Sequence, residues 1–159
     1  MENVVDIKSA ANNSIKLTYK TLNSEGFNQT LATLANQTGF GSFDAIYNVA
    51  KIVRQFSDEL RIARETYAKW TKPLLVTEED GTFKRAEKPH PLCPWEIKAD
   101  MTEEFNKQMD EFLKTEVTLN AKPLTFEDIG KIQLTPAQLI NLEPIFDPYS
   151  FAVPKASQH

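Results

Sequence analysis

A histidine and a cysteine lie three residues apart in a proline-rich segment. His90 and Cys93 belong to the run Lys-Pro-His-Pro-Leu-Cys-Pro-Trp, and Cys93 is the only cysteine of the chain. A structural zinc site takes about four ligands, so this pair is too small for one. A thiol–imidazole nucleophile pair needs both groups within hydrogen-bond reach, in a segment that the prolines stiffen. The alternative is an unreactive loop thiol beside a surface imidazole, and we therefore expect no catalytic residue and no enzyme.

Three other patterns resemble binding motifs without completing them. The acids at 78–80 precede Gly81, but a calcium loop needs a longer alternation of oxygen ligands, so a solvated turn explains them better. The Gly-Phe-Gly run at 39–41 lacks the lysine and the preceding strand of a phosphate loop. Acids that repeat at helical spacing over 103–111 either bind a basic protein or form a solvated face. We expect no metal site and no cofactor.

The charge of the chain argues against a dedicated nucleic-acid binder. Its 159 residues carry 18 basic and 22 acidic side chains, which gives a net charge of −4. Nucleic-acid-binding domains usually present a basic surface instead. Arg54, Arg61 and Lys69 could form a basic strip on one helix, but Asp58 and Glu65 lie between them and weaken its field. Nucleic acid is therefore not an expected partner.

The sequence contains no pattern typical of a membrane span or a signal peptide. No apolar run approaches the ~20 residues that cross a bilayer, and the first residues lack a basic start followed by an apolar stretch. A single cysteine excludes an internal disulfide and fits a reducing compartment or a particle assembled in one. We expect a soluble, intracellular chain with no membrane partner.

The strongest pattern in the sequence is a helical stripe within residues 43–70. Its apolar residues recur at alternating intervals of three and four, which is the a/d spacing of a heptad repeat. This spacing predicts a helix over about 42–71 that Ser42 caps, with every stripe residue on one face. Charges of both signs on the opposite face predict contact with solvent. The stripe consists of Ile46, Val49, Val53, Phe56, Leu60, Ala63, Tyr67 and Trp70.

A second helix is predicted over about 101–115, with Asp100 and Glu103 forming a capping box at its start. This helix is about half as long as the first, so it covers about half of the stripe. The rest is left to shorter helices of the same chain or to a neighbouring molecule. Both alternatives stay open from the sequence.

Two short strands complete the predicted fold. The segments 15–19 and 116–119 alternate apolar and polar residues, which predicts a small antiparallel sheet. Shorter helices are predicted at 24–36 and 136–143, each after a capping residue. The fold class that follows is α+β, mainly α, with the long helix packed antiparallel on the second helix.

The region between the two helices is predicted to be mostly irregular. The segments 74–77 and 82–84 predict a short hairpin that turns at an Asp-Gly pair. Residues 86–99 contain three prolines and predict an extended loop, because proline disfavours regular helix and sheet interior. Trp95 is expected to hold this loop against the body of the protein.

The organisation that these elements predict is one domain with two appendages. Residues 1–13 are polar and predict a flexible or partner-binding arm, residues 14–146 form the domain, and residues 147–159 form an extended tail.

Five aromatic and aliphatic residues are candidates for partner binding. Tyr149, Phe151 and Val153 alternate within the tail, and a proline-bounded segment has little means of burying its own side chains. Such a segment either adds to a partner as an arm or folds back on its own domain. Trp70 and Trp95 are the two other candidates.

Several short motifs occur in an order that extends over most of the chain, while 1–13, the proline-rich 88–94 and the tail after Asp147 stand apart from it. In this order the sequence resembles a family of small tailed-bacteriophage proteins of unknown function. The resemblance implies a viral origin and carries over no catalytic residue. The motifs are Ile-Lys-Leu-Thr at 15–18, Ala-Arg-Glu-Thr-Tyr at 63–67, Glu-Glu-Asp-Gly at 78–81, Glu-Phe-Asn-Lys at 104–107, Thr-Glu-Val-Thr-Leu at 115–119, and Leu-Thr-Pro-Ala at 134–137 leading to Leu-Glu-Pro at 142–144.

The function expected from the resemblance and the long stripe is non-enzymatic. The first expectation is a virion component of the head or tail, or an assembly protein, that contacts other phage subunits or itself. The alternative is an early phage protein that binds and inhibits a host enzyme or defence system. The corresponding location is the virion or the host cytoplasm.

Overall fold

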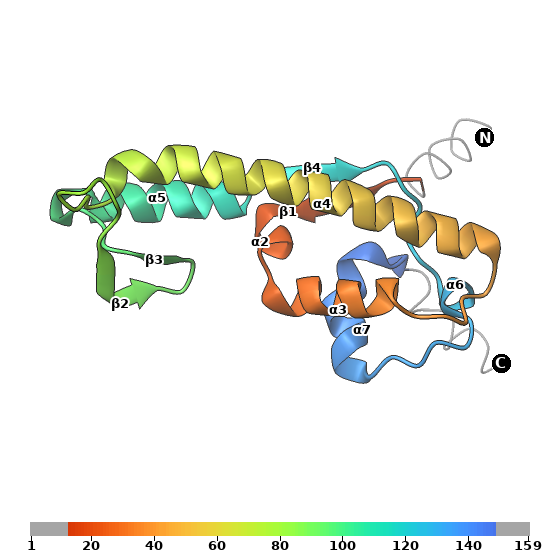
Figure 1. The fold of residues 1–159 in the computed structure, drawn as a ribbon. Coiled ribbons are helices and arrows are strands. Elements are labelled where there is room, and N and C mark those ends of the chain that lie inside the picture. The colour runs from red at the N-terminus through yellow and green to blue at the C-terminus, as the bar shows by residue number, and fades with distance from the viewer. Residues whose placement is uncertain (1–12, 149–159) are drawn as a thin grey trace, which may run out of the picture.

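One long helix runs through the length of the molecule. The computed structural model describes residues 13–148, and in it α4 (Phe43–Thr71) spans 29 residues (Figure 1). The Ser42 hydroxyl accepts a hydrogen bond from the Ala45 N–H at 3.1 Å, and Asp44 places a negative charge in the first turn. Both features stabilise a helix N-terminus. The predicted long helix and its cap are confirmed.

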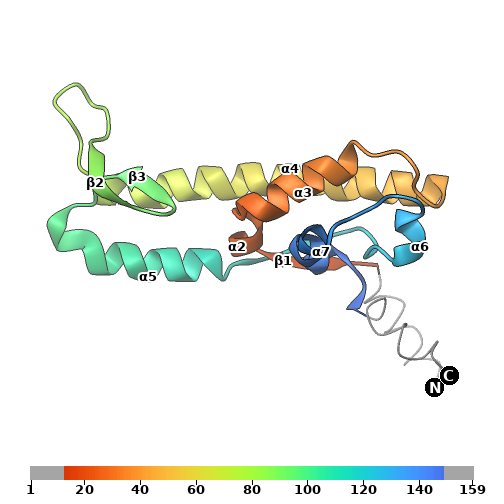
Figure 2. The same cartoon turned by 90° about the horizontal axis from the view of Figure 1, so that it is seen from below.

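The second helix, α5 (Thr102–Leu113), lies antiparallel beside the C-terminal half of α4, as both views show (Figures 1 and 2). This arrangement confirms the predicted helix pair. The predicted capping box is wrong, because Met101 precedes the helix and no side chain caps it. Asp100 lies one step earlier, in a 3-10 turn over Ala99–Met101, so its carboxylate does not cap the first turn.

The predicted small sheet is also confirmed. Strands β1 (Ile15–Thr18) and β4 (Glu116–Leu119) pair antiparallel, with Ile15 opposite Leu119. The inward side chains of Ile15, Leu17 and Leu119 are buried in the core. This sheet joins the beginning of the domain to the segment that follows α5.

The shorter helices α3, α6 and α7 lie on the side of the N-terminal half of α4, whereas α2 lies near the middle of α4 and contacts α5 (Figure 1). A four-residue helix, α2, follows β1 directly, a length too short for periodicity to predict. Thr125 and Thr135 each form a complete capping box, so the sequence sets these helix starts locally. The bounds are Tyr19–Leu22 for α2, Glu25–Ala35 for α3, Phe126–Ile129 for α6 and Pro136–Leu142 for α7.

The predicted irregular loop at 86–99 is a hairpin instead. Strands β2 (Arg85–His90) and β3 (Cys93–Trp95) pair antiparallel, with an irregularity between their two registered residue pairs. Proline removes a backbone donor, but each strand of a two-stranded sheet has an outer edge where no ladder bond is lost. The hairpin predicted just before it is confirmed by the bridge between Thr77 and Phe83.

The heptad stripe does not lie wholly on one face of α4. Ile46, its first residue, is 47% exposed, whereas Ala45 and Ile52, which the stripe omits, are buried. An α-helix has about 3.6 residues per turn, so a 3.5-residue repeat drifts by roughly 20° per heptad around a straight helix. The core follows the helix period, and the beginning of the stripe turns towards solvent.

The Gly-Phe-Gly run has a structural explanation in a close backbone approach. The Gly41 N–H donates to the Asp128 carbonyl at 3.0 Å, and the Lys131 N–H donates to the Gly39 carbonyl at 2.9 Å. A Cβ atom on Gly41 would lie 2.1 Å from the Glu127 carbonyl oxygen, so a side chain has no room there. These bonds hold the loop before α4 against the end of α6.

Candidate functional site

The three tail candidates, Tyr149, Phe151 and Val153, lie outside the described residues. Trp70 lies near the C-terminal end of α4, half-buried in an aromatic cluster with ring centroids 5.5 Å from Phe105 and 5.8 Å from Phe112. Its indole nitrogen is buried and has no hydrogen-bond partner among the described residues. The ring therefore contributes to the packing of α4 on α5.

Trp95, the other tryptophan candidate, is half-buried on β3. Its ring centroid lies 6.0 Å from that of Phe83, and the Arg85 guanidinium lies 5.6 Å above the ring. It also packs against the buried core, so it joins the two hairpins to the body of the molecule.

His90 and Cys93 are cross-strand neighbours in the β2–β3 hairpin. The Cys93 thiol is fully buried, rather than in a loop as expected from the sequence, and the half-buried His90 uses Nδ1 to accept the Leu92 N–H at 3.0 Å. The Tyr67 hydroxyl donates to the Leu92 carbonyl at 2.8 Å. Burial raises the pKa of the Tyr67 phenol, and the neighbouring Cys93 thiol adds to that rise. These contacts place the thiol in the packing between hairpin and helix, where a solvent-borne substrate does not reach it.

The acids at 78–80 occupy an exposed turn, as the sequence indicates. The Asp80 carboxylate accepts hydrogen bonds from the Thr82 hydroxyl at 2.6 Å and from the Thr82 N–H at 3.0 Å. These bonds lower the pKa of the Asp80 carboxyl. The Asp80 carboxylate therefore accepts hydrogen bonds from within the turn and stabilises it.

An apolar surface lies instead at the N-terminal end of α4. Phe43 is 89% exposed, Tyr47 is 69% exposed and Ile46 is 47% exposed, all within five consecutive residues. The other large apolar side chains with comparable exposure are scattered over separate segments at positions 62, 92, 126 and 140. A concentration of this kind is typical of an interaction surface. The α4 apolar face, as we name it, consists of Phe43, Ile46, Tyr47, Ala50 and Val53.

A groove runs along one side of the α4 apolar face. It has a volume of about 590 Å³ and separates α4 from the end of α3 and the residues that follow it. Ile46, Ala50 and Val53 line it from the helix, and Ala35 and Phe40 line it from the opposite side. The glycine-anchored loop holds Phe40 in this position, so the groove is part of the fold.

Charged residues flank the α4 apolar face without forming ion pairs of their own. Asp44, Lys51 and Arg54 have no salt-bridge partner among the described residues. The Lys51 ammonium lies 5.9 Å from the centre of the Tyr47 ring, a weak cation–π contact. These charges are therefore available to a partner molecule.

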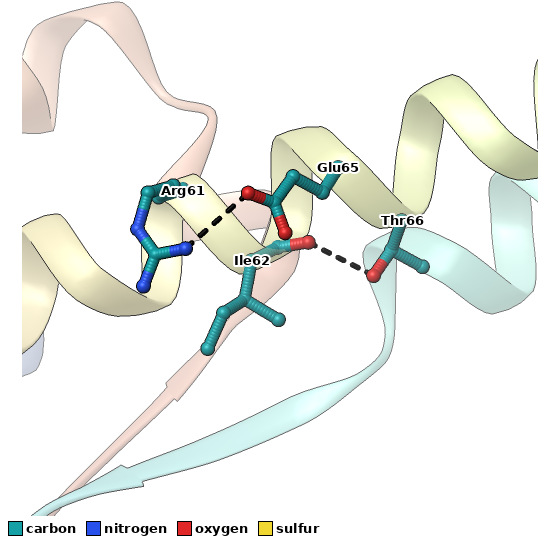
Figure 3. A network of polar contacts seen from close by, with 4 residues as sticks. All are labelled: Arg61, Ile62, Glu65 and Thr66. Atoms are coloured by element: carbon teal, nitrogen blue, oxygen red, sulfur yellow. Dashed lines mark hydrogen bonds and ion pairs between the residues drawn. The ribbon is translucent and has the colours of Figure 1, made fainter.

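Further along, the outward surface of α4 is polar. Arg61 and Glu65 form an ion pair at 3.3 Å, and the Thr66 hydroxyl donates to the Ile62 carbonyl at 2.9 Å (Figure 3). Ile62 is 40% exposed beside them. The apolar character of the outer surface is thus concentrated in the first three turns of the helix.

The α4 apolar face is not among the sites that the sequence predicts. Charges dominate the side of α4 opposite the heptad stripe, so the sequence predicts that this side faces solvent. A signal was present, because Phe43, Tyr47 and Ala50 follow each other at intervals of four and three residues on that side.

No group of three or more potential metal-ligating side chains occurs within residues 13–148. In the same part of the chain, none of the helices combines the length and the apolar character needed to cross a membrane. Comparisons with protein-family models, with curated proteins and with solved structures find no match to this chain.

Proposed function

We propose that this chain is a non-enzymatic tailed-phage protein that acts by protein–protein contact, as a virion component or an assembly protein. The α4 apolar face carries the proposal, because Phe43 and Tyr47 expose aromatic rings on a rigid, capped helix beside a preformed groove. Aromatic residues on rigid elements are typical anchors of protein interfaces. The phage assignment depends on the sequence resemblance.

The non-enzymatic part of the proposal is supported by the environment of Cys93. A nucleophilic thiol has to meet its substrate, and this thiol is buried with its Sγ 3.7 Å from the Trp95 carbonyl oxygen. Structural cysteines of this kind pack as small apolar side chains.

Mass spectrometry of purified particles from the phage that encodes the chain tests the virion role. We expect the protein in the particle at a fixed copy number, or a lower particle yield when its gene is deleted. Absence from the particle together with an unchanged yield contradicts the proposal.

An affinity purification from infected host cells separates this proposal from its alternative. Phage subunits recovered with the tagged chain support the virion or assembly role. A stoichiometric host protein instead supports an early protein that inhibits a host enzyme or defence system. The same purification with Ala50→Glu tests whether the recovered partner binds the α4 apolar face. This variant places a charge on that face without touching the core.

A further inference from the structure

We propose that a second copy of this chain docks on the α4 apolar face, with the two α4 helices antiparallel around a two-fold axis. The inference deepens the proposed function by naming one partner of the same surface. Three independent features of α4 support a second copy: its central seam, its charged flank and its apolar flank.

The central seam is complementary to itself in the antiparallel direction. Phe43, Tyr47, Ala50 and Arg54 recur at intervals of four, three and four residues along the exposed side. An axis between Tyr47 and Ala50 sets each Tyr47 against the partner's Ala50, and each Phe43 against the partner's Arg54. A large ring then meets a methyl group, and an aromatic face meets a guanidinium.

The charged flank of α4, which consists of Asp44 and Lys51, is complementary to itself in the same register. In an antiparallel helix pair, the same flank of each helix faces its counterpart. The axis that pairs Tyr47 with Ala50 brings each Asp44 near the partner's Lys51. These two side chains have opposite charges and no ion-pair partner among residues 13–148 of their own chain. The dimer therefore contains two such pairs.

The apolar flank is the third feature. Ile46 and Val53 lie on the groove side of α4 and meet their counterparts in the same arrangement, beside Phe40 and Ala35. The 47%-exposed Ile46 becomes covered there. An isologous contact of this kind uses one surface twice and closes after two copies, so it predicts a dimer and no filament.

The size of the surface predicts a reversible dimer. The contact covers about three helical turns on each copy, which places it at or below the lower end of specific interfaces, roughly 1,200 Å² in total. Such contacts are typically weak, with dissociation constants on the order of micromolar. The face can therefore exchange between a second copy and another phage subunit.

Sedimentation velocity of the full chain over about 1–200 µM tests the dimer. We expect a shift from monomer to dimer with rising concentration. Ala50→Glu, which buries a carboxylate on each side of the axis, is expected to weaken the dimer at least tenfold. Ala68→Glu is the control, because Ala68 is also exposed on α4 but outside the seam, and it leaves the dimer unchanged.

A charge exchange tests the direction of the helices. Asp44→Lys is expected to weaken the dimer, and the double variant Asp44→Lys with Lys51→Asp is expected to restore it. Circular dichroism of each variant verifies that α4 remains folded. A monomer throughout the concentration range overturns the inference, as does a dimer that Ala50→Glu leaves intact. Neither of these results contradicts the proposed phage function. Absence of the protein from the phage particle, in turn, does not contradict the dimer.

Discussion

The Tyr67 hydroxyl and the Cys93 thiol meet where the β2–β3 hairpin packs on α4. The hydroxyl donates to the Leu92 carbonyl at 2.8 Å, and the thiol is fully buried. The sequence indicated a loop thiol because the prolines around it discourage regular structure. It could not indicate that the hairpin folds over α4 and buries the thiol, since that depends on residues distant in the chain.

Tyr67→Phe is expected to lower the free energy of unfolding by about 1 kcal/mol at neutral pH, because the Leu92 carbonyl loses its donor. The wild-type phenol has a pKa raised above its ordinary value of 10.0. A raised pKa in the folded state gives stability that is complete below the ordinary pKa and is lost as the pH rises above it. Urea unfolding at neutral and at alkaline pH should therefore show the wild-type advantage shrinking above about pH 10. An advantage that grows with alkaline pH contradicts this assignment.

The pKa of Asp80 gives a second prediction for a single residue. Thr82 donates to the carboxylate from its hydroxyl and from its N–H. Thr82→Val removes the hydroxyl and is expected to move the depressed pKa of Asp80 back towards its ordinary value, since the hydroxyl bond is the largest cause of the shift. Thr82→Ser keeps the hydroxyl and should preserve the depressed pKa. Titration of the side-chain carboxyl by carbon NMR measures both, and equal pKa values in the two variants contradict the assignment.

The elements of the fold were predictable to different degrees, for physical reasons. Ser42, Ser24 and Thr135 each cap a helix through a local hydrogen bond, so α4, α3 and α7 begin within one residue of the helix starts that the sequence predicts. The β2–β3 hairpin was missed because its prolines argue against regular structure, and the pairing of the two strands is seen only in three dimensions. The buried face of α4 differs from the predicted one, because a heptad repeat and a straight helix have different periods.

Two isoleucines in α4 test whether its buried face follows the helix period or the heptad repeat. Ile52 is fully buried, so Ile52→Ala is expected to destabilise the protein by about 2–5 kcal/mol. Ile46 belongs to the heptad stripe but is 47% exposed, so Ile46→Ala should cost less than about 1 kcal/mol in the monomer. Chemical denaturation at low protein concentration compares them. A larger loss for Ile46→Ala restores the heptad interpretation.

In the whole molecule, α4 is the central helix, and its two halves pack against different elements (Figure 2). Its C-terminal half packs against α5 and is joined to the β2–β3 hairpin through the hydrogen bond from Tyr67 to Leu92, and its N-terminal half packs against α3 and α6. The sequence correctly indicated that α5 is too short to cover the whole helix. It did not indicate which residues stay exposed, because exposure depends on how α3 and the glycine-anchored loop approach α4. The spacing of Phe43, Tyr47 and Ala50 is present in the sequence, but the exposure of these residues beside a groove is seen only in three dimensions.

We propose that α4 contacts a partner through its exposed N-terminal surface, in the first instance the same surface of a second copy. Ala50 and Ala68 provide a matched pair for a crosslinking test. Both are exposed, and they lie eighteen residues apart, or about five full turns, so they point in the same direction from α4. In the antiparallel dimer, the two Ala50 residues are separated by about 4.5 Å in the direction of the helix axes. The two Ala68 residues are separated by roughly 58 Å in the same direction.

The most direct measurement is therefore disulfide formation in full-length Ala50→Cys and Ala68→Cys under the same mild oxidant. The native Cys93 is buried and serves as the common background. We predict a covalent dimer of Ala50→Cys that forms at micromolar protein, and no comparable dimer of Ala68→Cys. Equal yields from the two variants, or none from Ala50→Cys, would contradict an antiparallel dimer through α4.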